Sequence, residues 1–216
     1  MSRSILYFDK PGIENTEAVI EVVYERLKEG DIKSVVVASS SGKTGLKFAK
    51  RMAEETNLVI VSSQPGFSTP GVWKFDQKIL KELESLGCQV VKQSHILSGL
   101  ERSFTNKFSG VSHSEVVAES LRSLFGVGVK VAIECAIMAA DSGAIPIEKT
   151  IAVGGTTTSK GGEQILPFSS GPLTAITFLT FASWRFLLNR SEEKHDKNDQ
   201  TLLFSILRSH FKNPLE

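Results

Sequence analysis

Short runs of β-branched apolar residues alternate along the chain with longer segments whose apolar residues repeat about every 3.6 positions. This alternation is typical of parallel strands joined by helices, and it predicts a three-layer α/β/α sandwich with a mainly parallel sheet. The strands are expected at Ile5–Phe8, Val35–Ala38, Leu58–Val61, Gln89–Val91 and Thr150–Val153.

Helices are expected between these strands. Ser112 and Glu115 have the spacing of a capping box, and 129–140 fits a buried helix better than a strand. Glycines at positions 30 and 87 follow two other helical patterns and predict where those helices end. The apolar stripes of these two helices are Val19, Val22, Val23 and Leu27 in the first and Phe75, Ile79, Leu83 and Leu86 in the second.

The 216 residues suit one domain with an appendage. We expect an α/β domain over 1–190 and a tail over 191–216, because a polar run at Ser191–Gln200 interrupts the apolar pattern. An amphipathic helix is expected after that run, to pack on the domain or on a second subunit. Its apolar stripe is Leu202, Leu203, Ile206, Leu207 and Phe211.

Composition narrows the possible partners and the compartment. With 25 basic and 24 acidic residues the chain has no global field for nucleic acid. The apolar stretch Leu173–Leu188 is too short for a membrane span and contains Arg185, so a buried strand or helix is expected there and no membrane partner. The residues after Arg3 lack the long apolar core of a secretory signal, so no such signal and a cytoplasmic location are expected. Two cysteines and four histidines show no metal-site spacing, so no metal is predicted.

The segment after the second expected strand has the composition of an anion-binding turn. Small residues allow the backbone to approach a ligand, and the exposed amides at a helix start favour a phosphate. An ordinary serine-rich helix start would give the same pattern. The candidate phosphate-binding residues are Ser39, Ser40, Ser41, Gly42, Lys43 and Thr44.

A nucleoside-triphosphatase loop is excluded at this position. That motif requires glycine five residues before Gly42, where this chain has Val37. No G-x-S-x-G elbow follows Gly66 either, because Pro70 stands where the second glycine would be needed. Neither a P-loop hydrolase nor a serine hydrolase is therefore expected.

A second glycine-rich loop follows the last expected strand and repeats this chemistry. It would close on the same anion or on the other end of a nucleotide, although a flexible hairpin loop would have a similar composition. Its candidate ligand contacts are Gly155, Thr156, Thr157, Lys160, Gly161 and Gly162.

Two further loops carry candidate ligand contacts. Gly66 and Phe67 would present backbone and an aromatic face to a flat ring, or simply form a turn and a core contact. After the fourth expected strand, His95 and Arg102 are a possible proton-transfer group and a phosphate partner, with Ser98 between them. His95 and Glu134 are the weak catalytic candidates, and for His95 alone a structural role is the stronger interpretation.

Several segments carry a family resemblance. A strand followed by S-x-S-G-x-T, here Ser39 to Thr44, and then a helix resembles the phosphate loop in the carboxy-terminal domain of pyruvate kinases. In those enzymes the loop holds a phosphate of an allosteric sugar bisphosphate. Further segments resemble, in the expected order, a family of small stand-alone proteins with this fold: 66–67, 94–102, 107–110, 130–134, 138–143 and 151–156.

The resemblance implies a pyruvate-kinase-C-terminal-like domain without the catalytic barrel, hence no pyruvate kinase activity. It also implies that flavin mononucleotide or a similar phosphorylated molecule occupies the cleft. The family's second glycine loop is usually one residue shorter than the one here. Two alternatives stay open: a flavin-dependent oxidoreductase, and a regulatory module that senses a sugar phosphate.

Charge and aromatic residues are unevenly distributed. Residues 39–53 contain Lys43, Lys47, Lys50 and Arg51 and no acidic residue, which predicts a small positive mouth around the first loop. Six of the 13 phenylalanines fall between Phe168 and Phe211, which indicates a separate packing surface, or a surface for homo-oligomer formation.

Overall fold

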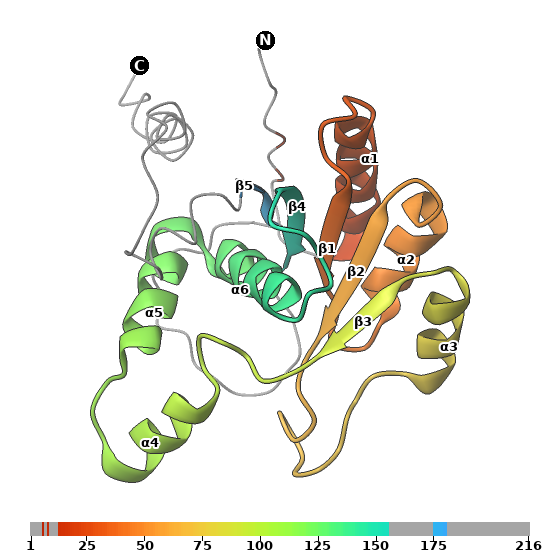
Figure 1. Cartoon of the computed structure of the whole chain (residues 1–216). Helices are drawn as coiled ribbons and strands as arrows, with labels where there is room; N and C mark the ends of the chain where they lie inside the picture. The colour runs from red at the N-terminus through yellow and green to blue at the C-terminus, as the bar shows by residue number, and fades with distance from the viewer. Residues whose placement is uncertain (1–5, 7, 9–12, 156–174, 181–216) are drawn as a thin grey trace, which may run out of the picture. The chain divides into compact units, whose positions relative to one another are not determined.

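The computed structural model describes residues 6, 8, 13–155 and 175–180, all within one compact unit, Met1–Thr180. Within these residues a five-stranded sheet has the order β3-β2-β1-β4-β5 (Figure 1). The strands β1 (Ser34–Ala38), β2 (Asn57–Ser62), β3 (Gln89–Lys92) and β4 (Lys149–Gly154) are parallel. Strand β5 (Ala175–Thr180) pairs antiparallel with β4. The chain is thus an α/β protein with a mainly parallel sheet, as the sequence predicts.

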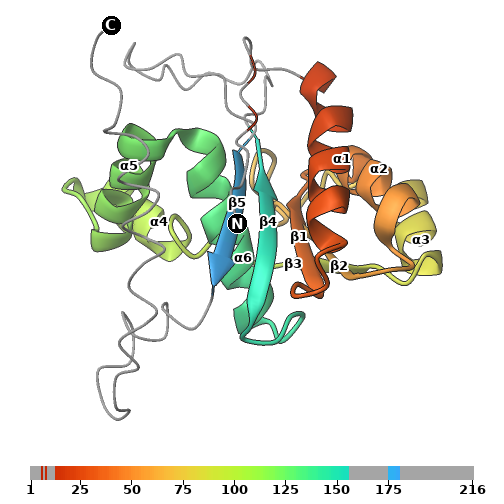
Figure 2. The ribbon, with the colours of Figure 1, turned by 90° about the horizontal axis from the view of Figure 1, so that it is seen from above.

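The central strands are apolar on both faces because helices cover both sides of the sheet. In β1, Val35, Val36 and Val37 are completely buried. Figure 2 shows the helices α1, α2 and α3 on one side of the sheet and α4, α5 and α6 on the other. β-Branched residues suit this position, since their stiff side chains pack well on a pleated surface.

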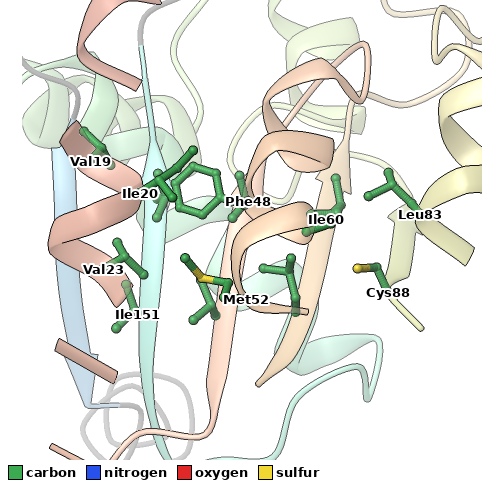
Figure 3. Packing of buried hydrophobic residues seen from close by; sticks show 14 of the residues in the cluster. Val19, Ile20, Val23, Phe48, Met52, Ile60, Leu83, Cys88 and Ile151 are labelled. Atoms are coloured by element: carbon green, nitrogen blue, oxygen red, sulfur yellow. The ribbon is translucent and has the colours of Figure 1, made fainter. Parts of the chain in front are cut away.

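On the first face, α1 (Thr16–Leu27), α2 (Lys43–Met52) and α3 (Gln77–Ser85) cover the parallel strands. A short 3₁₀ turn at Ile13–Asn15 precedes α1. Gly30 has φ +79°, and its amide donates to the carbonyl of Leu27 just after α1. The main core lies between these helices and the sheet (Figure 3), and its largest buried side chains include Ile20, Phe48, Met52, Ile60, Leu83 and Ile151.

On the second face, α6 (Val127–Asp141) lies directly on the sheet, and α5 (His113–Phe125) packs on α6. Because α6 is covered on two sides, it is apolar around most of its circumference. Its small residues allow a close approach to β4: a Cβ on Gly154 would lie 2.4 Å from the carbonyl oxygen of Gly128. Helix α4 (Leu100–Phe108) contacts α5 farther from the sheet.

Most of the expected elements are confirmed. The four parallel strands, the capping box of α5 and the helix over 129–140 are present. The helix expected to carry the stripe Phe75, Ile79, Leu83 and Leu86 begins only at Gln77, capped by Asp76, so Phe75 precedes it while still packing in the core. Part of the apolar stretch Leu173–Leu188 forms β5.

The expected strand Ile5–Phe8 is wrong for its two described residues. Leu6 and Phe8 belong to no strand, and the position beside β4 is taken by β5. Phe8 packs instead against the hydrophobic core, which accounts for the apolar character of this segment. Four apolar residues in a row do not distinguish a strand from any other buried segment.

The tail expected over 191–216, with its amphipathic helix, lies outside the described residues. None of the helices in the described ranges is long and apolar enough to cross a bilayer.

Candidate functional site

The loops that carry the predicted site residues meet at one edge of the sheet. Because β1 to β4 are parallel, the segments that follow them all emerge at the carboxyl edge. The chain moves from β1 to β2 and β3 in one direction and then returns to β4 on the other side of β1. Sheets of this kind bind ligands where the strand order reverses, which here lies between β1 and β4.

Two residues of the first loop shape the turn from β1 into α2. Ser39 is buried; its Oγ accepts a hydrogen bond from the amide of Gly45 at 3.1 Å, and its own amide donates to Val61. Gly42 has φ +88°, and a Cβ there would lie 2.7 Å from side-chain atoms of Phe75 and of Ile79. Ser39 therefore satisfies one amide of the first turn of α2, and Gly42, the N-cap residue, is required by conformation and packing.

The backbone amides of this loop are the unused donors of the site. Among the residues that the structure describes, none accepts a hydrogen bond from the amides of residues 40–44. Ser40 and Lys43 are exposed, and Ser41 and Thr44 are half-buried. These amides precede or begin α2, where the helix dipole adds partial positive charge. The arrangement is suited to an anion with several acceptor oxygens.

The positive mouth expected around residues 39–53 is not present in that form. Carboxylates from α1 and α3, distant in the sequence, neutralise most of it. Three of its four basic side chains form ion pairs: Lys47 with Glu17 at 2.6 Å, Lys50 with Glu82 at 3.0 Å and Arg51 with Glu21 at 2.9 Å. Lys43, at the first position of α2, forms no ion pair with the described residues. It is the remaining positive side chain beside the free amides.

The loop after β2 begins with a tight turn over residues 64–67. The Phe67 amide donates to the Gln64 carbonyl at 3.3 Å, Pro65 is the second residue, and Gly66 has φ +83°. Proline followed by a left-handed glycine is the signature of a type II turn. The Gly66 amide donates to the carbonyl of Val72, which ties the turn to the rest of its loop.

This turn brings two predicted site residues together. The Phe67 side chain is 53% exposed, and its ring centroid lies 5.2 Å from that of His95, with the planes tilted by 58°. His95 belongs to the loop after β3, so the pair joins two neighbouring strand ends. Such tilted ring contacts are favourable, and they leave a face of Phe67 accessible to a flat ligand.

A buried ion pair in α6 supports the His95 loop. Lys130 Nζ lies 2.6 Å from Glu134 Oε2, and both side chains are 5% exposed. Glu134 Oε1 accepts a hydrogen bond from the amide of Leu97 at 3.0 Å. Since both carboxylate oxygens are engaged, the geometry gives Glu134 a positioning role for this loop. Ser98, whose amide donates to the His95 carbonyl, closes the turn.

The electrostatic environment disfavours a charged His95. Burial lowers the pKa of its imidazole, Lys130 and Arg102 lower it further, and Glu134 acts in the opposite direction. A neutral imidazole offers one donor and one acceptor to a ligand.

The thiols of Cys88 and Cys135 are buried, and their surroundings make them unreactive. Burial raises the pKa of Cys88, and burial and Glu134 raise the pKa of Cys135 to about 12. A thiol is a weak nucleophile, so neither cysteine is poised for nucleophilic chemistry at neutral pH.

Arg102 lies in α4, away from the first loop in the fold. It lines an open groove of about 760 Å³ that is built from α4, α5, the segment between them and Leu97 of the loop after β3. Of the predicted site residues that the structure describes, Arg102 alone lines this groove. The groove lacks the free amides and aromatic pair found at the strand ends, so the strand ends are the stronger candidate site.

The second glycine loop is described only at its start. Gly155 is exposed, and a Cβ there would meet no atom within 4 Å. Thr156, Thr157, Lys160, Gly161 and Gly162 lie outside the described residues. Gly155 follows β4 directly, and β4 pairs with β1, so this loop starts beside the strand that leads into the first loop.

Three residues at this edge are not identified as functional by sequence reasoning. Lys130 stands four residues before Glu134 in an otherwise apolar helix, a spacing that could have revealed the ion pair. Gln64 precedes Pro-Gly, a turn signal that gives no indication of its side chain. Leu97 contributes its backbone amide, for which no sequence signal exists.

Within the described ranges, no group of three or more His, Cys, Asp and Glu side chains is placed to hold a metal ion. A comparison of the chain with models of known protein families finds no match.

Proposed function

We propose that this chain binds a small phosphorylated ligand at the carboxyl edge of its sheet, with flavin mononucleotide as the leading candidate. We further propose that its fold is like that of the pyruvate kinase carboxy-terminal domain and that it has no pyruvate kinase activity. The observation that carries the binding proposal is a run of backbone amides at residues 40–44. No described residue accepts a hydrogen bond from any of them.

The chemistry of a phosphate group matches these donors. Its oxygens accept several hydrogen bonds at once, and its negative charge is favoured at the start of a helix. Lys43 adds a full positive charge at the same place, and the half-buried Thr44 adds a hydroxyl. Residues of the second glycine loop, from Gly155 to Gly162, are proposed to cover the phosphate.

The remainder of the site suits a flat ring. Phe67 is more than half exposed although it is a large apolar side chain, and it lies against His95 in the next loop. Stacking on such a face is favourable for a planar heterocycle. A phosphate site on one loop and an aromatic face on the neighbouring loops together favour a nucleotide over a simple sugar phosphate.

Binding is tested by titrating the purified full chain with flavin mononucleotide, riboflavin and ribose 5-phosphate in a calorimeter. We expect riboflavin, which lacks the phosphate, to bind at least tenfold more weakly than flavin mononucleotide. Mass spectrometry of small molecules released from the natively purified chain identifies a resident ligand. If none of the three compounds binds and no phosphorylated molecule is released, the proposal is wrong.

A charge reversal localises the phosphate. Lys43→Glu places a carboxylate beside the free amides, and we expect flavin mononucleotide affinity to fall at least tenfold. The fold should tolerate this change, because a carboxylate in the first turn of a helix is favourable. Lys47→Ala, which removes a paired lysine one turn later in α2, is the matched control and should bind normally. Equal binding by the Lys43→Glu variant and wild type would place the phosphate elsewhere.

A further inference from the structure

One buried polar atom next to the proposed site has no partner. Gln64 lies in the loop after β2 and is half-buried, but its Oε1 is shielded from solvent and accepts no hydrogen bond. Buried acceptors in folded proteins are almost always paired, because an unpaired one keeps the cost of leaving water. Apart from Arg26, which has further interactions, no other described residue has such a side-chain atom. Gln64 therefore requires an explanation.

The turn over residues 64–67 relates this atom to the aromatic pair. Gln64 and Phe67 are the first and last residues of the turn and are joined by its hydrogen bond, so their α-carbons lie within about 7 Å of each other. Gly66 at φ +83° and its bond to Val72 fix the turn. The backbone positions that carry the Gln64 side chain and the exposed ring of Phe67 are thus held by the same turn.

Other nearby donors are already used. The indole N–H of Trp73 donates to Ser62 Oγ at 3.0 Å and to the Ser63 carbonyl at 3.1 Å. The amide group of Gln93 in the next loop donates to the Met138 carbonyl at 3.1 Å. These donors are therefore engaged elsewhere, and the Gln64 oxygen, which is shielded from solvent in its present position, is paired by a group from outside only when the half-buried side chain turns.

We infer that Gln64 is a specificity residue whose side chain turns its unpaired oxygen toward the ligand, where the oxygen accepts a hydrogen bond from an N–H group of a planar heterocycle stacked on Phe67. The inference rests on the proposed function, since it concerns the ring of the same ligand. It selects rings that carry an imide, a lactam or an amino group and rejects those in which that nitrogen is alkylated. A site built around a hydrogen bond discriminates strongly against an analogue that lacks it.

The probe pair is flavin mononucleotide and its 3-methyl derivative. The oxidised flavin ring has one N–H group, and methylation removes that donor while keeping the ring and the phosphate. We expect wild type to bind the methylated compound at least tenfold more weakly. Gln64→Met keeps the length of the side chain but removes the acceptor, so it should bind both compounds with the same, lower affinity. Ribose 5-phosphate, which has no ring to recognise, should bind wild type and variant equally.

Stability separates a ligand-binding role from a structural one. Since Gln64→Met removes an unpaired buried oxygen, its melting temperature without ligand should equal or exceed that of wild type. Gln89→Met, on an exposed residue at the start of β3 and the opposite edge of the sheet, is the matched control and should change neither stability nor binding.

The outcomes distinguish the two proposals. If wild type binds ribose 5-phosphate and flavin mononucleotide but does not discriminate against the methylated ring, the role of Gln64 is wrong and the binding function stands. A Gln64→Met variant that binds flavin mononucleotide like wild type, or that melts well below it, also overturns the role of Gln64 and assigns its oxygen to an ordered water or a structural partner. If wild type binds none of these probes, both proposals fall together.

Discussion

The carboxylate of Glu134 in α6 accepts a hydrogen bond from the backbone amide of Leu97, 37 residues earlier in the chain, at 3.0 Å. Its other oxygen lies 2.6 Å from the ammonium group of Lys130. One buried carboxylate thus connects a helix under the sheet with the loop that carries His95. His95, whose ring lies against Phe67, stands two residues before the anchored Leu97.

Breaking the ion pair should destabilise the fold. Glu134→Gln leaves the buried Lys130 ammonium without its counter-charge, and Lys130→Met leaves the buried Glu134 carboxylate without its own. Each variant should cost roughly 3–5 kcal/mol in unfolding free energy. The double variant Lys130→Met/Glu134→Gln should lose much less than the sum of the two, because no isolated charge remains. Urea denaturation of the four proteins gives the coupling energy. Strictly additive losses would show that the two side chains do not interact in solution.

The contact between β4 and α6 leads to a second expectation. In Gly154→Ala the new Cβ would lie 2.4 Å from the Gly128 carbonyl oxygen and 2.6 Å from the Ala132 nitrogen, both backbone atoms that cannot rotate away. We expect a loss on the order of 3 kcal/mol in unfolding free energy. Gly155→Ala is the matched control, since its Cβ would enter open space. Similar melting temperatures for the two variants would contradict this packing.

The parts of the fold that sequence could predict are those with local signals. Three consecutive valines in β1 and the Ser112–Glu115 capping box are complete within a few residues. Helix α4 has only a short signal, since Leu100, Phe104 and Phe108 recur every four residues, and all three are more than half exposed, so this stripe faces no core in the described structure. Apolar periodicity indicates a helix but does not say what covers its apolar face.

The site is predictable only in part for the same reason. The serine and glycine residues of the first loop mark a turn wherever they occur. The net charge around that loop, however, can be predicted only by knowing which side chains pack beside α2. Glu17, Glu21 and Glu82 come from two other helices, and their pairing with α2 depends on the tertiary fold. Sequence makes Glu134 a candidate for proton transfer, yet both its oxygens are committed to Lys130 and Leu97.

The hydroxyl of Ser39 gives a third expectation. Ser39→Ala leaves the buried amide of Gly45 without its acceptor, and loss of such a cap costs about 1 kcal/mol. Ser40→Ala, on the exposed neighbouring residue, should leave the melting temperature unchanged. Calorimetric melting of both variants is the measurement. A larger loss in Ser40→Ala than in Ser39→Ala would mean that Ser40 caps the helix in solution.

The Arg26–Asp31 pair at the amino edge of the sheet controls stability in acid. Arg26 is buried and binds Asp31 through two hydrogen bonds, of 2.6 and 3.0 Å, which with Lys149 lower the pKa of Asp31 to about 2 from 3.8. The unfolded chain therefore takes up a proton first, and the stabilisation is complete above about pH 4 and is lost between about pH 4 and pH 2. Since Asp31 is partly exposed, Asp31→Asn should cost only about 1 kcal/mol at pH 7. Parallel acid-denaturation curves for Asp31→Asn and wild type would argue against the pair.

His95 should make the stability of the chain sensitive to mild acid in a different range. Burial, with Lys130 and Arg102, lowers its pKa below 6.5, and the opposing Glu134 does not reverse the shift. The unfolded state therefore binds a proton before the folded state does, and the free energy of unfolding falls as the pH drops through 6.5. Above about pH 7 His95 is neutral in both states and contributes no slope. His95→Gln removes this titration, so its unfolding free energy should decline less than that of wild type between about pH 7 and pH 5, as measured by urea denaturation at half-unit intervals. If the two curves stay parallel over that interval, the imidazole is not held in the enclosed position that its contact with Phe67 requires.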